Sequence, residues 1–121
     1  MKKILFLFFV LSSFNVVYSQ WEECNNGLYG GVIRALAISG SNIFAGTEGG
    51  GMFLSTDGGN SWSQKNNGLT ITGVFSLAIS GSNIFAGTWG GVFLSTDGGN
   101  SWSQKNNGLT ITGVFSLAIS G

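Results

Sequence analysis

The sequence contains no histidine and no proline, and only 8% of its 121 residues are charged. Without histidine it lacks the commonest metal ligand and the commonest general base. So few charges exclude a solvated, disordered tail, and 21 glycines exclude a bundle of helices. We therefore expect an ordered chain rich in strands and turns, with no metal site and no cofactor.

Charge is balanced but unevenly placed. The formal net charge is zero, yet two of the five cations, Lys2 and Lys3, lie at the extreme N-terminus. Without them, Arg34 and two lysines stand against five acidic residues. Because no basic patch remains to neutralise phosphates, we expect no nucleic-acid partner.

Residues 1–19 have the pattern of a signal peptide. Lys2 and Lys3 form a positive start, and the apolar run of residues 4–11 follows before serines and asparagine dilute it. The run is shorter than the roughly 20 residues of a spanning helix, so we expect no membrane span after cleavage. We predict cleavage after Ser19 and a bacterial-type exported protein, either secreted, periplasmic or on the cell surface. The alternatives are an uncleaved anchor and a buried N-terminal strand.

Cys24 is the only cysteine, so this sequence cannot form an internal disulfide bond. The preceding residues, Trp21, Glu22 and Glu23, lack the small side chains that precede a lipidated bacterial cysteine. We therefore interpret Cys24 as an incidental thiol.

The strongest signal is an internal repeat of about 40 residues. Residues 36–47 recur as residues 77–88, and all 28 residues of 54–81 recur as 94–121. A third copy begins at Leu117 and reaches Gly121. This period matches one blade of a β-propeller, which has about 40–45 residues.

Each repeat predicts four short antiparallel strands joined by glycine and asparagine turns. In the first repeat these are Ile33–Ser39, Ile43–Thr47, Met52–Thr56 and Ser61–Lys65. The fold class is therefore all-β, a propeller fragment of two four-stranded blades plus the first strand of a third, Val114–Ser120. The predicted organisation is a signal peptide (1–19), a lead-in segment (20–31), blade 1 (32–73), blade 2 (74–113) and the start of blade 3 (114–121).

Two blades fall short of the roughly 4–8 that close a propeller. We therefore expect an incomplete propeller. The alternative is that several chains assemble into a ring.

Two turns resemble the Asp-box, also called the BNR repeat, with the pattern Ser-x-Asp-x-Gly-x-Ser/Thr-Trp. Its positions are Ser55, Asp57, Gly59 and Trp62 in one copy and Ser95, Asp97, Gly99 and Trp102 in the other. The resemblance implies propeller blades like those of sialidases, sortilin-type receptors, xyloglucan-cleaving hydrolases and photosystem II assembly factors. Because those proteins differ in function, the motif specifies the fold better than the activity.

We interpret these motifs as structural. A short Asp side chain accepts hydrogen bonds within its own turn, glycine permits unusual backbone angles, and tryptophan packs beneath. The alternative makes Asp57 and Asp97 catalytic carboxylates or calcium ligands. However, an EF-hand loop needs a Glu at its twelfth position, where counting from Asp57 gives Gly68.

One turn differs between the copies. Glu48 in the first repeat is replaced by Trp89 in the second. In the resembling family this turn lies on the face opposite the Asp-box, where ligands commonly bind. Glu48 and Trp89 are therefore candidate ligand contacts, and the alternative is that Trp89 fills a gap between blades.

The function predicted is an exported, non-catalytic module that binds a protein or a glycan. The first alternative is part of a glycoside hydrolase whose catalytic residues lie outside this chain. Sialidases need an arginine triad and a tyrosine nucleophile, whereas residues 20–121 hold only Arg34 and Tyr29 of these types. The second alternative is a factor similar to those that assemble photosystem II.

The signal-peptide pattern makes a direct prediction. N-terminal sequencing of the exported protein is expected to begin at Gln20 or within a residue or two of it. Recovery of soluble extracellular protein that still carries Met1 would contradict this prediction.

Overall fold

The computed structural model describes residues 20–110 and 113–120, and the predicted signal peptide, residues 1–19, lies outside them. The described residues form two four-stranded antiparallel sheets in simple sequence order. The first sheet contains β1 (Ile33–Ser39), β2 (Asn42–Thr47), β3 (Met52–Ser55) and β4 (Ser63–Gln64). The second contains β5 (Val74–Ser80), β6 (Asn83–Thr88), β7 (Gly91–Ser95) and β8 (Ser103–Gln104). The predicted all-β class with two four-stranded blades is confirmed.

The inner strands match the prediction and the outer strands are shorter than predicted. β1 and β5 have the expected bounds, whereas β4 covers only Ser63–Gln64 of the expected Ser61–Lys65. The reason is that the preceding N–H groups have other acceptors. The N–H of Ser61 donates to Asp57 Oδ1, and that of Trp62 donates to the carbonyl of Asn26.

The third copy of the inner strand, Val114–Ser120, is not a strand in the structure. Its backbone is tied to the second sheet at one described point, where the N–H of Val114 donates to the carbonyl of Thr88. A strand is defined by a ladder with a neighbour, and the described residues contain no neighbour for this segment.

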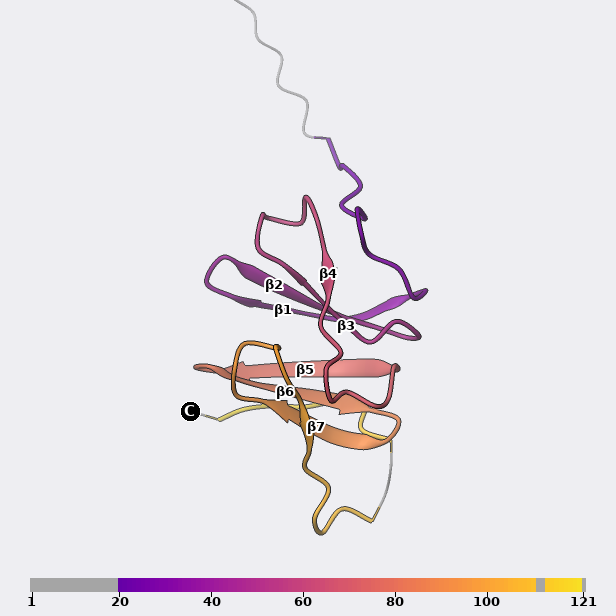
Figure 1. Cartoon of the computed structure of the whole chain (residues 1–121), viewed down its shortest axis with the longest axis vertical. Helices are drawn as coiled ribbons and strands as arrows, with labels where there is room; N and C mark the ends of the chain where they lie inside the picture. The colour runs from indigo at the N-terminus through magenta and orange to yellow at the C-terminus, as the bar shows by residue number, and fades with distance from the viewer. Residues whose placement is uncertain (1–19, 111–112, 121) are drawn as a thin grey trace, which may run out of the picture.

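The two sheets stack face to face, as Figure 1 shows, and the core lies between them. Phe44 and Met52 of the first sheet meet Ile84, Ala86 and Phe93 of the second, and all five side chains are buried. The contact is close enough to need a glycine, because a Cβ on Gly46 would lie 2.6 Å from Val74 Cγ1.

A short joint, Asn66-Asn67-Gly68-Leu69, connects the sheets and binds both of them. Asn66 faces back, because its Oδ1 accepts from the N–H of Met52 and its Nδ2 donates to the carbonyl of Gly50. Asn67 faces forward, because its carbonyl accepts from the N–H of Trp102. The joint therefore sets the position of each sheet against the next.

Ser76 is the one buried side chain in the described residues whose polar atom has no hydrogen-bond partner. Its counterpart in the first repeat is Ala35. We expect Ser76→Ala to leave the free energy of unfolding unchanged or raise it by up to about 1 kcal/mol, because no bond is lost. Urea denaturation measures this.

Thr88→Val is the matched control, because Thr88 Oγ1 is buried and bonded at both its donor and its acceptor. That variant is expected to lose about 1–3 kcal/mol. A loss for Ser76→Ala as large as that for Thr88→Val would show that Ser76 has a partner after all.

Candidate functional site

The two turns that resemble the Asp-box lie at one end of the sheets and have nearly the same hydrogen bonds. We call Ser55–Trp62 and Ser95–Trp102 the Asp turns. In the first, Asp57 accepts from the Ser55 hydroxyl (2.8 Å), the Ser61 N–H (2.8 Å) and the Ser61 hydroxyl. The Ser55 hydroxyl also accepts from the N–H of Gly59, at 2.8 Å.

These donors hold the pKa of Asp57 below its ordinary value, with the Ser61 hydroxyl the largest cause and the Ser61 N–H the next. Asp97 has the same partners and the same direction of shift. Both carboxylates thus accept three hydrogen bonds within their own turns, and neither lines the pocket at the other end of the sheets.

The indole N–H groups of the tryptophans bond the Asp turns to the residues just before the preceding Asn-Asn-Gly-Leu segment. Trp102 is only 6% exposed, and its Nε1 donates to the carbonyl of Lys65. Trp62 is half-buried, and its Nε1 donates to the carbonyl of Cys24. Each ring lies under a glycine of positive φ, Gly59 or Gly99. The eight residues predicted from the motif therefore form two turn structures, one for each sheet.

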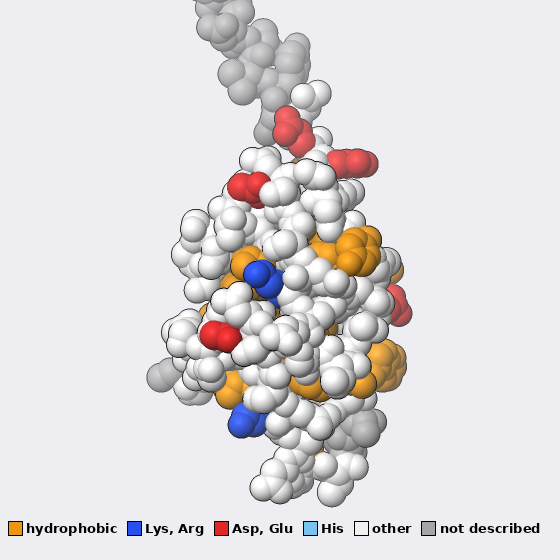
Figure 2. All heavy atoms as spheres, in the orientation of Figure 1, with side chains coloured by type: hydrophobic (Ala, Val, Ile, Leu, Met, Phe, Trp, Pro, Cys, Tyr) orange, Lys and Arg blue, Asp and Glu red, His pale blue; other side chains and the backbone are white. Residues whose placement is uncertain are grey.

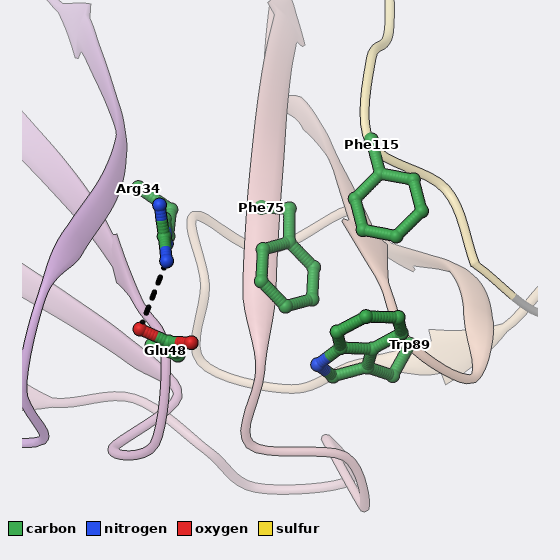
Figure 3. A pocket seen from close by; sticks show the side chains of 5 residues that line it. All are labelled: Arg34, Glu48, Phe75, Trp89 and Phe115. Atoms are coloured by element: carbon green, nitrogen blue, oxygen red, sulfur yellow. Dashed lines mark hydrogen bonds and ion pairs between the residues drawn. The ribbon is translucent and has the colours of Figure 1, made fainter.

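The other predicted residues, Glu48 and Trp89, lie at the opposite end of the sheets. Each follows the second strand of its sheet. A depression of about 400 Å³ opens there, lined by Arg34, Glu48, Phe75, Trp89 and Phe115 (Figure 3). This depression is the candidate functional site.

The lining residues occupy only two positions of the repeat. Arg34, Phe75 and Phe115 are equivalent positions in the three copies of the inner strand, and Glu48 and Trp89 are equivalent in the turn. Sequence reasoning found the turn position and missed the strand position. The signal was available, because Arg34 and Phe75 lie in one of the few segments where the two copies differ.

The turns that carry Glu48 and Trp89 are anchored by buried threonines. Thr47 Oγ1 accepts from the N–H of Gly50 at 2.8 Å and donates to the carbonyl of Gly51. Thr88 makes the equivalent bonds to Gly90 and Gly91. The side chains of Glu48 and Trp89 therefore project from anchored turns.

Three aromatic rings form one wall of the depression. The ring of Trp89 packs edge-to-face against Phe75 and Phe115, with centroids 4.8 and 5.0 Å away. Trp89 nevertheless remains 54% exposed. The ring thus packs against its neighbours and still offers a large surface to a ligand.

An ion pair forms the other wall. Arg34 Nη2 donates to Glu48 Oε2 at 3.1 Å, and each side chain is 45% exposed (Figure 3). An exposed pair of this kind contributes little stability, about 0–1 kcal/mol. Breaking this ion pair therefore costs little free energy, and Arg34 and Glu48 are available to hydrogen-bond a ligand. The depression presents an apolar half and a polar half of balanced charge.

Other kinds of site find no support in the described part of the chain. No three His, Cys, Asp or Glu side chains gather there to hold a metal ion. Nor does the part of the chain that the structure describes include a helix with the length and hydropathy to cross a membrane. Charged side chains are few and scattered on the face seen in Figure 2.

No protein-family model matches this chain, and no curated protein matches it. Among solved structures it is similar to an ancestral GH74 enzyme, with a TM-score of 0.57 and 28% identity over 73% of this chain. It also resembles YCF48 bound to D1 peptide, with a TM-score of 0.49 and 23% identity over 59% of this chain. The matches span 12% and 25% of those chains. The fold is that of β-propeller blades.

The lowered pKa of Asp57 predicts how its turn responds to pH. A carboxyl group with a lowered pKa stabilises the fold fully above its unfolded pKa, about 3.9, and loses this effect as pH falls through its folded pKa. The stability difference between the natural chain and Asp57→Asn is therefore expected to shrink as pH falls from about 6 to about 2.

Urea denaturation at several pH values measures this difference. Ser61→Ala is the control, because it removes the largest cause of the shift and should weaken the pH dependence as well. A difference between natural chain and Asp57→Asn that stays constant with pH would contradict the assigned hydrogen bonds.

Proposed function

We propose that this protein is an exported, non-catalytic β-propeller module that binds a glycan in the depression between Arg34 and Trp89. The observation that carries the proposal is the exposed ring of Trp89, held in place beside an ion pair. Export rests on the sequence pattern of residues 1–19.

The chemistry of the lining favours a neutral carbohydrate. An aromatic ring offers an apolar face to the C–H groups of a sugar, while Arg34 donates to its hydroxyl groups and Glu48 accepts from them. Because the charges of Arg34 and Glu48 cancel, the depression has no net preference for a charged ligand. On this proposal the Asp turns stabilise the scaffold, and the ligand binds at the opposite end of the sheets.

The lining of the depression supports a role in binding. Glycoside hydrolysis uses two carboxyl groups about 5–10 Å apart. Among the residues that line the depression, Glu48 is the only acid, and it is paired with Arg34. Asp57 and Asp97 are bound within turns at the other end of the sheets.

The second candidate function is part of a glycoside hydrolase, and the similarity to the ancestral GH74 enzyme favours it. On this alternative the depression would hold substrate, and catalytic acids would come from residues that the depression does not contain. Release of reducing ends from a bound oligosaccharide by this chain would contradict the non-catalytic proposal.

The test of the proposal is Trp89→Ala in a titration with neutral β-linked glucan and xylan oligosaccharides. We expect the affinity for the bound oligosaccharide to fall about 10- to 30-fold, because a truncated aromatic anchor costs about 1.4–2 kcal/mol. Isothermal titration calorimetry measures it, and urea denaturation checks that the variant is folded.

Trp21→Ala is the matched control, because Trp21 is fully exposed and does not line the depression. Its affinity should be unchanged. If the natural chain and Trp89→Ala bound the oligosaccharide with equal affinity, the ligand would bind elsewhere than in the depression. If the chain bound peptides and none of the oligosaccharides, the ligand would be a protein and the glycan proposal would be wrong.

A further inference from the structure

The joint sequence Asn-Asn-Gly-Leu occurs three times in the chain, as residues 25–28, 66–69 and 106–109. All three copies form the same tight turn, in which the leucine N–H donates to the carbonyl of the first asparagine at 2.8–2.9 Å. The glycine of each copy has a positive φ, between 85° and 90°. The three joints therefore share one local sequence and one turn conformation.

The second asparagine and the glycine of each joint are a chemically reactive pair. The backbone nitrogen that follows an asparagine can attack the carbon of its side-chain amide, and glycine hinders this attack least because it has no Cβ. The new C–N bond closes a five-membered succinimide ring, and ammonia leaves with the proton of the glycine N–H. Water then opens the ring to aspartate or isoaspartate, so the net reaction is hydrolysis of the asparagine amide.

The pair in the middle joint, Asn67-Gly68, is covered by the next Asp turn. The carbonyl of Asn67 accepts from the N–H of Trp102 at 2.9 Å, and Asn67 Nδ2 donates to the carbonyl of Asn100 at 3.4 Å. Gly68 lies so close to Trp102 that an added Cβ would collide with the carbonyl oxygen of this tryptophan. Because ring closure turns the peptide group between Asn67 and Gly68, these contacts must open before the reaction can occur.

The pair in the first joint, Asn26-Gly27, has equivalent cover from the first Asp turn. The carbonyl of Asn26 accepts from the N–H of Trp62 at 2.9 Å, and its Nδ2 donates to the carbonyl of Asn60 at 3.3 Å. A Cβ on Gly27 would likewise collide with the carbonyl oxygen of Trp62. Two of the three reactive pairs are therefore held by the Asp turn that follows them.

The pair in the last joint, Asn107-Gly108, is open. Both residues are exposed, and no described atom lies within 4 Å of a Cβ built on Gly108. Among the described residues, the Asn107 carbonyl has no donor and its side-chain amide has no acceptor. The next residue, Leu109, is 43% exposed, whereas its counterpart Leu69 is 5% exposed. This pair differs from Asn67-Gly68 in its cover and not in its local sequence.

We propose that Asn107 is a site of spontaneous deamidation, and that cover by a following Asp turn protects the equivalent Asn26 and Asn67. The substrate is the asparagine amide, water is the co-reactant, and the products are ammonia and an aspartate or isoaspartate residue. This inference rests on the joints and holds whether or not the depression binds a glycan.

Deamidation would disable the joint that it modifies. It replaces an amide, which donates hydrogen bonds, by a carboxylate, which only accepts them. In the covered joints that amide donates to a carbonyl of the next Asp turn, as Asn67 does to Asn100. The isoaspartate product also lengthens the backbone by one carbon. The reaction therefore inactivates a joint that stays open and spares a joint that is covered.

Trypsin separates the three sites for measurement, because it cleaves after Arg34, Lys65 and Lys105. The first pair then lies in the peptide that ends at Arg34, the second between the two lysines, and the third in the peptide after Lys105. The chain is incubated at neutral pH, and tandem mass spectrometry of these peptides measures the deamidated fraction at each pair over time.

We expect Asn107 to deamidate at least about tenfold faster than Asn67 in the folded chain, because reaction at Asn67 requires two hydrogen bonds to open first. Asn26 should be protected in the same way. Equal rates at Asn67 and Asn107 in the folded chain would overturn the proposal.

The same measurement in concentrated urea is the control for sequence. Residues 65–81 and 105–121 are identical, so Asn67 and Asn107 should react at equal rates once the chain is unfolded. A difference that persists in urea would come from position along the chain and not from cover, and would overturn the proposal.

A longer chain tests the effect of cover on Asn107 itself. A copy of residues 82–109 added after Gly121 supplies the rest of a third repeat with its Asp turn, and we expect deamidation at Asn107 to slow at least about tenfold. The matched control adds only residues 82–94, which end before the Asp turn, and should leave Asn107 fast. Equal rates at Asn107 in the two extended chains would contradict protection by the Asp turn.

Discussion

The structure depends on one contact that recurs between neighbouring repeats: the tryptophan of an Asp turn is bonded to the joint before it and to the residue that precedes this joint. The backbone N–H of Trp102 donates to Asn67 of the joint, and its indole N–H donates to Lys65, just before the joint. The two bonds fix where the second sheet begins relative to the end of the first. Phe44 packs in the buried cluster that the two sheets share.

This arrangement separates the two ends of the molecule by role. At the Asp turns, hydroxyl and N–H donors each give the carboxylate three hydrogen bonds, so these acids stabilise the turn. At the opposite end, Thr47 and Thr88 fix the turn backbone and leave the following side chain exposed. A rigid backbone with free side chains is the usual setting for a binding site.

The repeat made most of the fold predictable. Identical copies gave the same strands, and their glycine turns marked where each strand ends, so the inner strands β1 and β5 were predicted with their observed bounds. The length of the outer strands was overestimated at Ser61 and Trp62. Their N–H groups donate to Asp57 in the turn and to Asn26 in the lead-in segment, and therefore cannot pair with β3. A local sequence pattern does not reveal which acceptor each backbone N–H will bond. Phe75 and Phe115 were missed as site residues because they read as core, and only stacking of successive repeats brings them beside Trp89.

Differences between the copies gather where the depression lies. Residues 36–47 and 53–68 of the first repeat are identical to their counterparts in the second, so most of each strand, the Asp turn and Asn66 to Gly68 of the joint do not vary. The changes fall in residues 29–35 and 48–52, which are the approach to β1 with its first three residues and the turn after β2 with the first residue of β3. These two segments meet at the candidate site, where Arg34 and Glu48 in one repeat correspond to Phe75 and Trp89 in the next. An array of identical units would present the same surface at every step. By changing only these segments, the chain places a polar side and an aromatic side around one depression on an unchanged framework, and on the proposed function that asymmetry would favour one orientation of a bound glycan.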